Sequence, residues 1–198
     1  MKKKMRLIIV DGLDGVGKDT HAQLIKKRYE TKGLRVRVRS HPESDNVFGR
    51  TSKKALLGSG KINQAKASAF YALDILHSLK QFYHRNKEYD VLILVRYLMG
   101  TAYLPSSLAK IGYRFFMKFV PTSEYMFFLD ASPDDLVTRV RTRSETEMFE
   151  TRDEFVKVRK KALMLAAHDW YIIDTSGSVE KTFAAIEQVL SQLDEHKK

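Results

Sequence analysis

A short segment near the amino terminus, residues 6–20, constrains the fold more than any other part of the sequence. It starts with the apolar run LIIV at 7–10, which is typical of a strand buried on both faces. A turn rich in glycine follows, and a helical pattern begins at Lys18. The order of strand, glycine turn and helix predicts the first unit of a parallel α/β sheet.

The spacing of the turn, Gly12-x-x-x-x-Gly17-Lys18, is the P-loop pattern in its required context. Glycines let the backbone aim successive N–H groups at one point, and the helix N-terminus adds partial positive charge. We therefore predict a site for the phosphates of a nucleoside triphosphate, with Lys18 reaching the terminal phosphates. A chance glycine turn is the alternative. The predicted site comprises Gly12, Leu13, Asp14, Gly15, Val16, Gly17, Lys18, Asp19 and Thr20.

Strands and helices alternate along the rest of the chain. Further strands are predicted at 35–39, 90–95, 125–130 and 170–174, with helical patterns between them. Pro105 and Gly112 leave two options for 98–119, either two short helices or a helix and a loop. The pattern predicts one α/β domain over residues 1–198, with a five-stranded parallel sheet flanked by helices.

Composition excludes several classes of protein. No apolar run approaches the roughly 20 residues of a membrane span. The amino terminus lacks the apolar stretch of a secretory signal, so we expect an intracellular, cytoplasmic protein without a membrane partner. The absence of cysteine excludes disulfides and thiolate zinc sites.

The formal net charge of +11 raises the hypothesis of nucleic-acid binding. Part of the excess lies in the terminal tails, and no recognition motif accompanies it. A solvated surface together with a site for anionic nucleotides accounts for the charge, so nucleic acid is not the expected partner.

Further motifs follow the glycine loop in a defined order. Asp14 stands inside the loop, His41-Pro42-Glu43 follows the second strand, Phe70-Tyr71-Ala-Leu-Asp74 lies on a helix, and Val95-Arg96-Tyr97 precedes Ala102-Tyr103. Over nearly the whole chain this series resembles the thymidylate kinases, a family of P-loop nucleoside monophosphate kinases. Their corresponding motifs are Phe-Pro-Glu, Asp-Arg-Tyr and Ala-Tyr or Ala-Phe.

The resemblance implies the three-layer P-loop kinase fold and transfer of the γ-phosphoryl group of ATP, with Mg²⁺, to dTMP. It implies that Asp14 accepts a hydrogen bond from the 3′-hydroxyl of the acceptor, and that Pro42 belongs to the acceptor site. It also implies that Tyr71 stacks on the base and that Tyr103 excludes a 2′-hydroxyl. A turn-stabilising aspartate and core tyrosines are the alternatives.

Arg96 is the candidate that the residues themselves favour at the acceptor. It follows the carboxyl end of a buried strand, where open α/β sheets bind ligands. A guanidinium group also forks onto phosphate. The alternative is an ordinary surface arginine after a strand.

The segment 139–152 is rich in arginine and glutamate and falls where the family has a basic lid. We predict catalytic roles for Arg139 and Arg143, which lie one helical turn apart. A solvated helix face is the alternative.

Four positions depart from the family. Val95 replaces an aspartate, Asp19 replaces the hydroxyl residue after the lysine, and Ser44 and Ile75 replace arginines that serve acceptor binding. Because an acid is lost at 95 and gained at 19, we expect Asp19 to contact Mg²⁺, with Asp11 as an outer-shell helper and Thr20 as the fallback hydroxyl. The alternative is that Asp19 only stabilises the first turn of its helix.

These departures keep other functions open. The leading hypothesis is an active nucleoside monophosphate kinase acting on dTMP. The alternatives are a weakly active or inactive ATP-binding relative and a kinase for a different monophosphate. The resemblance also implies a possible homodimer, for which the aromatic-rich stretch 113–119 would serve either as a contact or as core.

Overall fold

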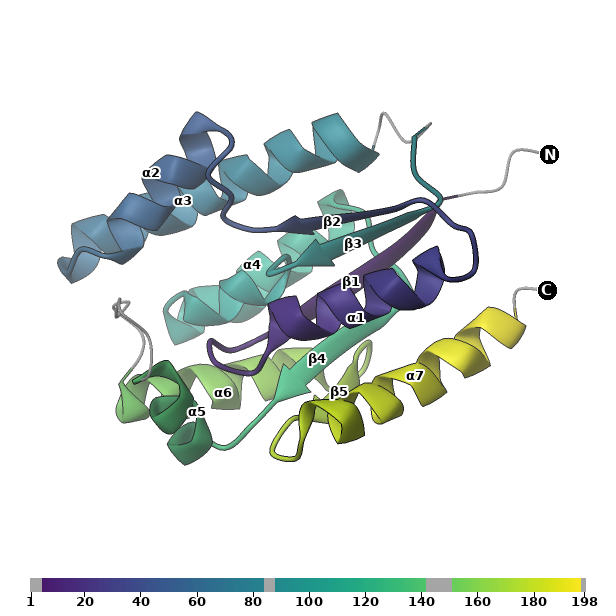
Figure 1. Ribbon diagram of the computed structural model, residues 1–198. Helices are drawn as coiled ribbons and strands as arrows, with labels where there is room; N and C mark the ends of the chain where they lie inside the picture. The colour runs from purple at the N-terminus through teal and green to yellow at the C-terminus, as the bar shows by residue number, and fades with distance from the viewer. Residues whose placement is uncertain (1–4, 84–87, 142–150, 197–198) are drawn as a thin grey trace.

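The computed structural model describes residues 5–83, 88–141 and 151–196. Within these ranges five parallel strands form one sheet in the order β2-β3-β1-β4-β5 (Figure 1). The strands are β1 (Arg6–Gly12), β2 (Val36–Ser40), β3 (Val91–Val95), β4 (Met126–Asp130) and β5 (Tyr171–Asp174). The predicted α/β fold with a five-stranded parallel sheet is confirmed.

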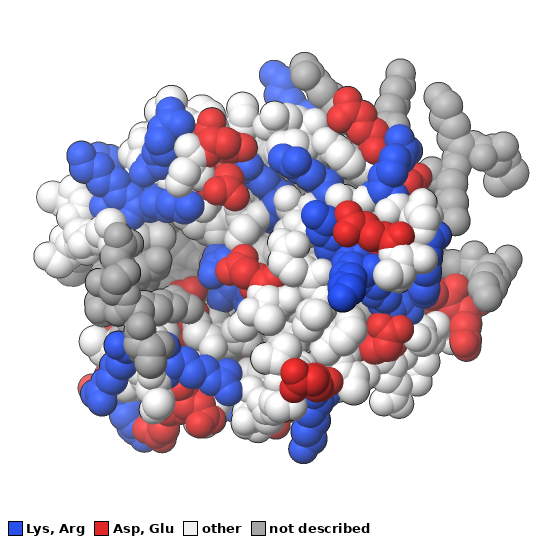
Figure 2. Space-filling view, viewed as in Figure 1, with Lys and Arg blue, Asp and Glu red and all other residues white. Residues whose placement is uncertain are grey.

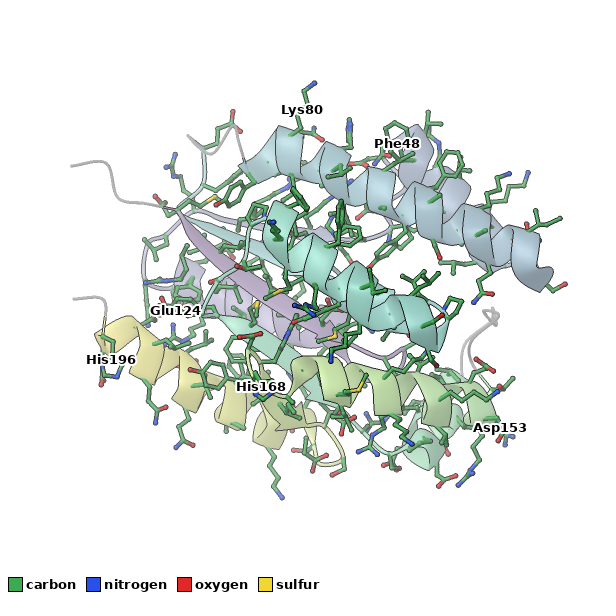
Figure 3. All side chains as sticks on the ribbon, turned by 180° about the vertical axis from the view of Figure 1, so that it is seen from behind. Phe48, Lys80, Glu124, Asp153, His168 and His196 are labelled. Atoms are coloured by element: carbon green, nitrogen blue, oxygen red, sulfur yellow. The ribbon has the colours of Figure 1, made fainter. Side chains whose placement is uncertain are left out.

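Helices cover both faces of this sheet (Figure 1, Figure 3). One face carries α1 (Lys18–Glu30) and α7 (Val179–Glu195). The other carries α4 (Ser106–Phe119) and α6 (Arg152–Ala166), with α3 (Gly60–Ser78) beside them. The other α-helices of the described residues are α2 (Val47–Leu56), which packs along α3, and α5 (Pro133–Val140), which packs against α6. A short π-helix, Leu79–Tyr83, continues α3.

Strand β3 lies between β2 and β1 and is buried along its whole length, as its continuous apolar run predicts. Its last residue, Val95, is fully buried between β1 and β2. This strand therefore ends without the carboxylate that the family has at this position. The next residue, Arg96, leaves the strand with a φ of 55°.

The segment 98–119 forms a short 3₁₀ helix, Met99–Tyr103, followed by α4. Pro105 immediately precedes α4, where its missing N–H costs nothing, and Gly112 lies inside the helix. The aromatic stretch 113–119 contributes to both the buried and the exposed face of α4. Tyr113 is buried and accepts a 2.7 Å hydrogen bond from Trp170, whereas Phe115 and Phe119 are exposed and pack together at 4.5 Å between ring centroids.

Among the described residues, none of the helices has the length and apolarity needed to cross a bilayer. Figure 2 shows basic and acidic side chains interspersed over the face in view rather than gathered into one basic stripe. On this face the excess positive charge is therefore spread over the surface.

Candidate active site

The glycine loop packs closely against the end of β4. Gly12 has a φ of 145°, and a Cβ atom there would lie 2.3 Å from the carbonyl oxygen of Leu129, so the position requires glycine. Gly17 is the N-cap of α1 and provides no side-chain cap. The N–H groups of the first helical turn are therefore suited to an outside anion. Leu13 and Val16 bury their side chains in the core, so they offer only backbone to a ligand.

Lys18 lies folded into this loop. Its ammonium group donates hydrogen bonds to the carbonyl oxygens of Gly12 at 2.9 Å and Leu13 at 2.6 Å, and lies 3.5 Å from Asp14 Oδ1. Burial lowers the pKa of Lys18, and the nearby Asp14 opposes this shift. The cation thus lies at the centre of the turn, while the neighbouring Asp19 and Thr20 are exposed at its rim.

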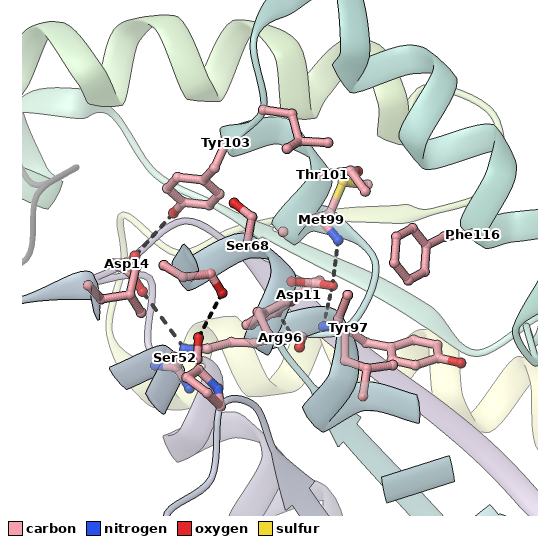
Figure 4. Close-up of a pocket in the computed structure, with 18 of the residues that line it drawn as sticks. Asp11, Asp14, Ser52, Ser68, Arg96, Tyr97, Met99, Thr101, Tyr103 and Phe116 are labelled. Atoms are coloured by element: carbon pink, nitrogen blue, oxygen red, sulfur yellow. Dashed lines mark hydrogen bonds and ion pairs between the residues drawn. The ribbon is translucent and has the colours of Figure 1, made fainter. Parts of the chain in front are cut away.

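One cavity brings the loop together with the predicted acceptor residues (Figure 4). Residues from several separate segments line it, and among them are Asp14, Lys18, Pro42, Tyr71, Arg96 and Tyr103. Apolar and hydroxyl side chains complete the wall, including Leu56, Ala67, Ser68, Met99, Leu104 and Phe116. The cavity therefore has a charged end at the glycine loop and a largely apolar remainder.

Arg96 is paired with groups from α1, from β2 and from the glycine loop. Its Nη1 donates to Asp19 Oδ2 at 2.8 Å and to Ser40 Oγ at 2.9 Å, and its Nε lies 3.8 Å from Asp14 Oδ1. Burial acts to lower the pKa of Arg96, but the charges of Asp14 and Asp19 outweigh it and raise the pKa above its usual value. Partial burial acts to raise the pKa of Asp19, but Arg96 holds it below its usual range. Both groups are charged at neutral pH.

The two predicted tyrosines both lie at the cavity. The hydroxyl of Tyr103 donates to Asp14 Oδ2 at 3.0 Å (Figure 4). The ring of Tyr71 packs against Gly100, where a Cβ atom would lie only 2.7 Å from the ring. The absence of a side chain at Gly100 is thus what admits the tyrosine.

Asp11 is buried and joins the end of β1 to the turn after β3. Its Oδ2 accepts hydrogen bonds from the backbone N–H groups of Tyr97, Leu98 and Met99 at 2.8–3.0 Å. Its Oδ1 accepts a further bond from Gly12 N at 3.2 Å. Burial raises the pKa of Asp11, although the hydrogen bonds oppose this effect. The carboxylate thus fixes the turn behind Arg96, and the outer-shell metal role stays a prediction.

Arg139 lies beside the glycine loop, at the end of α5. Its guanidinium donates to the carbonyl oxygen of Gly15 at 3.4 Å and to that of Thr175, after β5, at 2.7 Å. Arg143 and the rest of the predicted lid at 142–150 lie outside the described residues.

The two departures in acceptor binding occupy different places. Ile75 is buried and lines the cavity, so it presents an apolar side chain where the family has an arginine. Ser44 is exposed and accepts a 2.9 Å hydrogen bond from Lys53, while Arg50 donates to its backbone carbonyl at 3.0 Å. Neither Arg50 nor Lys53 lines the cavity.

Ser40 is the residue at this site that the sequence did not reveal. The sequence predicted a strand at 35–39, which stops one residue before Ser40, whereas β2 includes Ser40 as its last residue. Its position at the carboxyl end of a parallel strand was the available signal, since such ends meet at one edge of the sheet.

A magnesium ion would require ligands from bound phosphates. Among residues 5–83, 88–141 and 151–196, no three His, Cys, Asp or Glu side chains group into a metal site. Mg²⁺ is usually held by one or two carboxylates together with substrate phosphates and water. The exposed carboxylate of Asp19, next to Lys18, fits that mode of binding.

Comparisons with known proteins agree with this geometry. The thymidylate kinase family profile matches residues 10–186. A probable thymidylate kinase of Pyrobaculum aerophilum is 26% identical over 193 residues, which cover 96% of this chain and 98% of the relative. One of Archaeoglobus fulgidus is 27% identical over 195 residues, covering 93% and 94% of the two chains.

The fold is shared with a solved structure of a kinase. The thymidylate kinase of Candida albicans superposes with a TM-score of 0.74 over 98% of this chain and 94% of its own, at 15% identity. The chain has the glycine loop with a cavity beside it, and the family profile matches it over residues 10–186. The chain therefore belongs to the thymidylate kinase family.

Proposed function

We propose that this protein transfers the γ-phosphoryl group of ATP to dTMP, giving ADP and dTDP. One observation carries the proposal: a single cavity holds the P-loop lysine and the acceptor-side residues Asp14, Arg96 and Tyr103. Membership of the thymidylate kinase family supports a phosphotransferase that uses a nucleotide phosphoryl donor.

The donor phosphates would bind where the loop amides and the first turn of α1 converge. Lys18 would then exchange its bonds to the carbonyls of Gly12 and Leu13 for bonds to phosphate oxygens. That exchange costs little, because a charged acceptor forms stronger hydrogen bonds than a neutral carbonyl. The ammonium would neutralise charge on the phosphates during transfer.

Asp19 would contact Mg²⁺ directly or through water. Bound there, such an ion would supply positive charge to the phosphates during transfer. The position of Asp19 in the first turn of α1, next to Lys18, supports this role.

The acceptor would bind with its phosphate at Arg96 and its sugar between Asp14 and Tyr103. The tyrosine hydroxyl holds one oxygen of Asp14, so the carboxylate is oriented before a 3′-hydroxyl arrives. The ring of Tyr103 would then occupy the space of a 2′-hydroxyl and favour deoxynucleotides. The apolar part of the cavity, with Tyr71 and Ile75, would hold the base.

We further propose that the chain works as one domain with 139–152 as its lid. The placement of Arg139 between Gly15 and Thr175 supports a role for this arginine at the donor phosphates. A homodimer also stays a prediction, and the exposed rings of Phe115 and Phe119 on α4 suit such a contact.

A coupled assay of ADP release tests the central proposal. The acceptors are dTMP, dUMP, dCMP, dAMP, dGMP and UMP, and the control enzyme is Lys18→Met. We expect the largest kcat/KM with dTMP and a loss of about 10²–10³-fold in the control.

The same assay addresses the alternatives. A preference for another monophosphate would reassign the acceptor. ATP binding without acceptor-stimulated turnover would favour an inactive relative, an alternative motivated by Val95, Ser44 and Ile75.

A further inference from the structure

The guanidinium of Arg96 is already held by other side chains of this protein. Its Nη1 donates to Asp19 at 2.8 Å and to Ser40 at 2.9 Å, and the hydroxyl of Ser40 donates to the other oxygen of Asp19 at 3.0 Å. The three residues come from the first turn of α1, the end of β2 and the turn after β3. Together they form a closed ring of contacts at the edge of the cavity.

The backbone of Arg96 is fixed independently of this ring. Its N–H donates to the carbonyl of Val10 at 3.2 Å, and its carbonyl accepts from the hydroxyl of Tyr71. Its φ of 55° is the one positive φ among the described non-glycine residues. A ligand can therefore redirect the side chain without moving the chain that carries it.

Nη1 cannot keep both of its bonds in this ring and also bind a phosphate that contacts the two Nη atoms of the guanidinium group. A guanidinium Nη atom carries two hydrogens, and Asp19 and Ser40 take one each. A phosphate gripped by the two Nη atoms needs one of these hydrogens, and it presents the same kind of anionic oxygen as a carboxylate. The acceptor phosphate and Asp19 thus compete for one position.

Releasing Asp19 from Arg96 costs little free energy. Its side chain is 57% exposed, so the freed carboxylate returns to water, whereas Arg96 is 27% exposed and stays at the cavity. Exposed ion pairs contribute little to stability, and a dianionic phosphate outcompetes a single carboxylate. The exchange is thus favourable once an acceptor arrives.

We propose that Asp19 and Ser40 form a holding contact that keeps Arg96 occupied until the phosphate of the acceptor monophosphate replaces the carboxylate of Asp19. The inference rests on the proposed kinase function. It adds that Asp19, a side chain of the protein itself, competes with the acceptor phosphate for Arg96. The freed carboxylate is then available for the metal role proposed above.

Calorimetric titration of dTMP into the protein, without ATP and without Mg²⁺, isolates this contact. Asp19→Asn keeps the size of the side chain and removes its charge, so we expect dTMP to bind about five-fold more tightly. Ser40→Ala should shift the affinity in the same direction by a smaller factor. In an Arg96→Ala background, Asp19→Asn should change nothing.

Glu43→Gln is the matched control for charge. It removes one negative charge next to Pro42, which lines the cavity, and Glu43 pairs with Lys53 rather than with Arg96. Its dTMP affinity should equal that of the unmodified protein. Thermal melting checks that each variant is folded.

The outcomes separate this inference from the proposed function. Unchanged or weaker binding of dTMP to Asp19→Asn, in a protein that phosphorylates dTMP, overturns the holding contact alone. A gain seen with another monophosphate but not with dTMP supports the contact and overturns the acceptor assignment. If none of the five deoxynucleoside monophosphates binds either protein, both proposals fail.

Discussion

The hydroxyl of Tyr71, on α3, donates a hydrogen bond to the backbone carbonyl of Arg96. Burial raises the pKa of Tyr71 well above its usual value, so the hydroxyl keeps its proton and stays a donor. The same side chain therefore lines the cavity with its ring and supports the residue expected to bind phosphate. The resemblance implied only the first of these roles.

Tyr71→Phe removes the hydroxyl and keeps the ring, so it tests the role of the hydroxyl alone. We expect the KM for the acceptor to rise by up to about ten-fold, because Arg96 loses a support. We also expect a loss of stability of about 1 kcal/mol, because the partly buried carbonyl of Arg96 loses its donor. Tyr125→Phe is the control, since its hydroxyl donates to the carbonyl of Leu193, in α7, at 3.1 Å. The control should lose similar stability at unchanged KM. Equal KM values in steady-state assays of both variants would contradict the supporting role.

Asp19→Ala tests the metal role through the Mg²⁺ dependence of turnover. We expect the Mg²⁺ concentration at half-maximal rate to rise about ten-fold, because a carboxylate ligand is lost. Asp19→Ser restores the hydroxyl that the family has at this position and should recover part of the dependence. An unchanged Mg²⁺ profile in Asp19→Ala would refute the metal role.

Much of the fold followed from local patterns. The apolar run of β3 predicted a strand because it is short and rich in β-branched residues, and the spacing of the glycine loop predicted a turn between a strand and a helix. The segment 98–119 stayed ambiguous because Gly112 disfavours a helix interior by only about 1 kcal/mol relative to alanine, and packing of α4 through Ala109 and Tyr113 outweighs that cost. Propensity alone could not supply that tertiary contribution.

The site was predictable where one residue sits at a strand end and unpredictable where several segments meet. Arg96 follows β3 directly, so its place at the ligand edge could be inferred. Its contact with Asp19 and Ser40 joins positions 77 and 56 residues away in sequence. Likewise, Asp11 looked like a helper for a metal, yet its bonds to the N–H groups of 97–99 depend on a turn that the sequence did not specify.

Tyr103 is expected to set the preference for deoxynucleotides. Tyr103→Ala opens space beside Asp14, so we expect the ratio of kcat/KM for dUMP over UMP to fall about ten-fold or more, since one steric clash is removed. Tyr103→Phe keeps the ring and loses only the hydroxyl bond to Asp14. This control should retain the ratio while losing some activity with both acceptors. A preserved ratio in Tyr103→Ala would exclude the steric role.

His41 gives the protein a specific dependence of stability on pH. Its ring is buried, its Nδ1 lies 3.2 Å from the carbonyl of Val95, and its Nε2 has no hydrogen-bond partner among the described residues. Burial lowers the pKa of His41 to about 4, and the charge of Asp74 only partly opposes this. The folded protein therefore holds the ring neutral, whereas the unfolded chain takes up a proton near pH 6.5.

His41→Phe, which introduces the residue of the family motif, should flatten this dependence. Because the unfolded state binds the extra proton, the native protein loses stability as pH falls from about 6.5 to 4, by up to about 3 kcal/mol in total. Urea unfolding at pH 7, 6 and 5 should show this loss in the native protein and a smaller slope in His41→Phe. His168→Phe, at an exposed position, should keep the native slope. Parallel slopes for the native protein and His41→Phe would mean that another group carries the pH dependence.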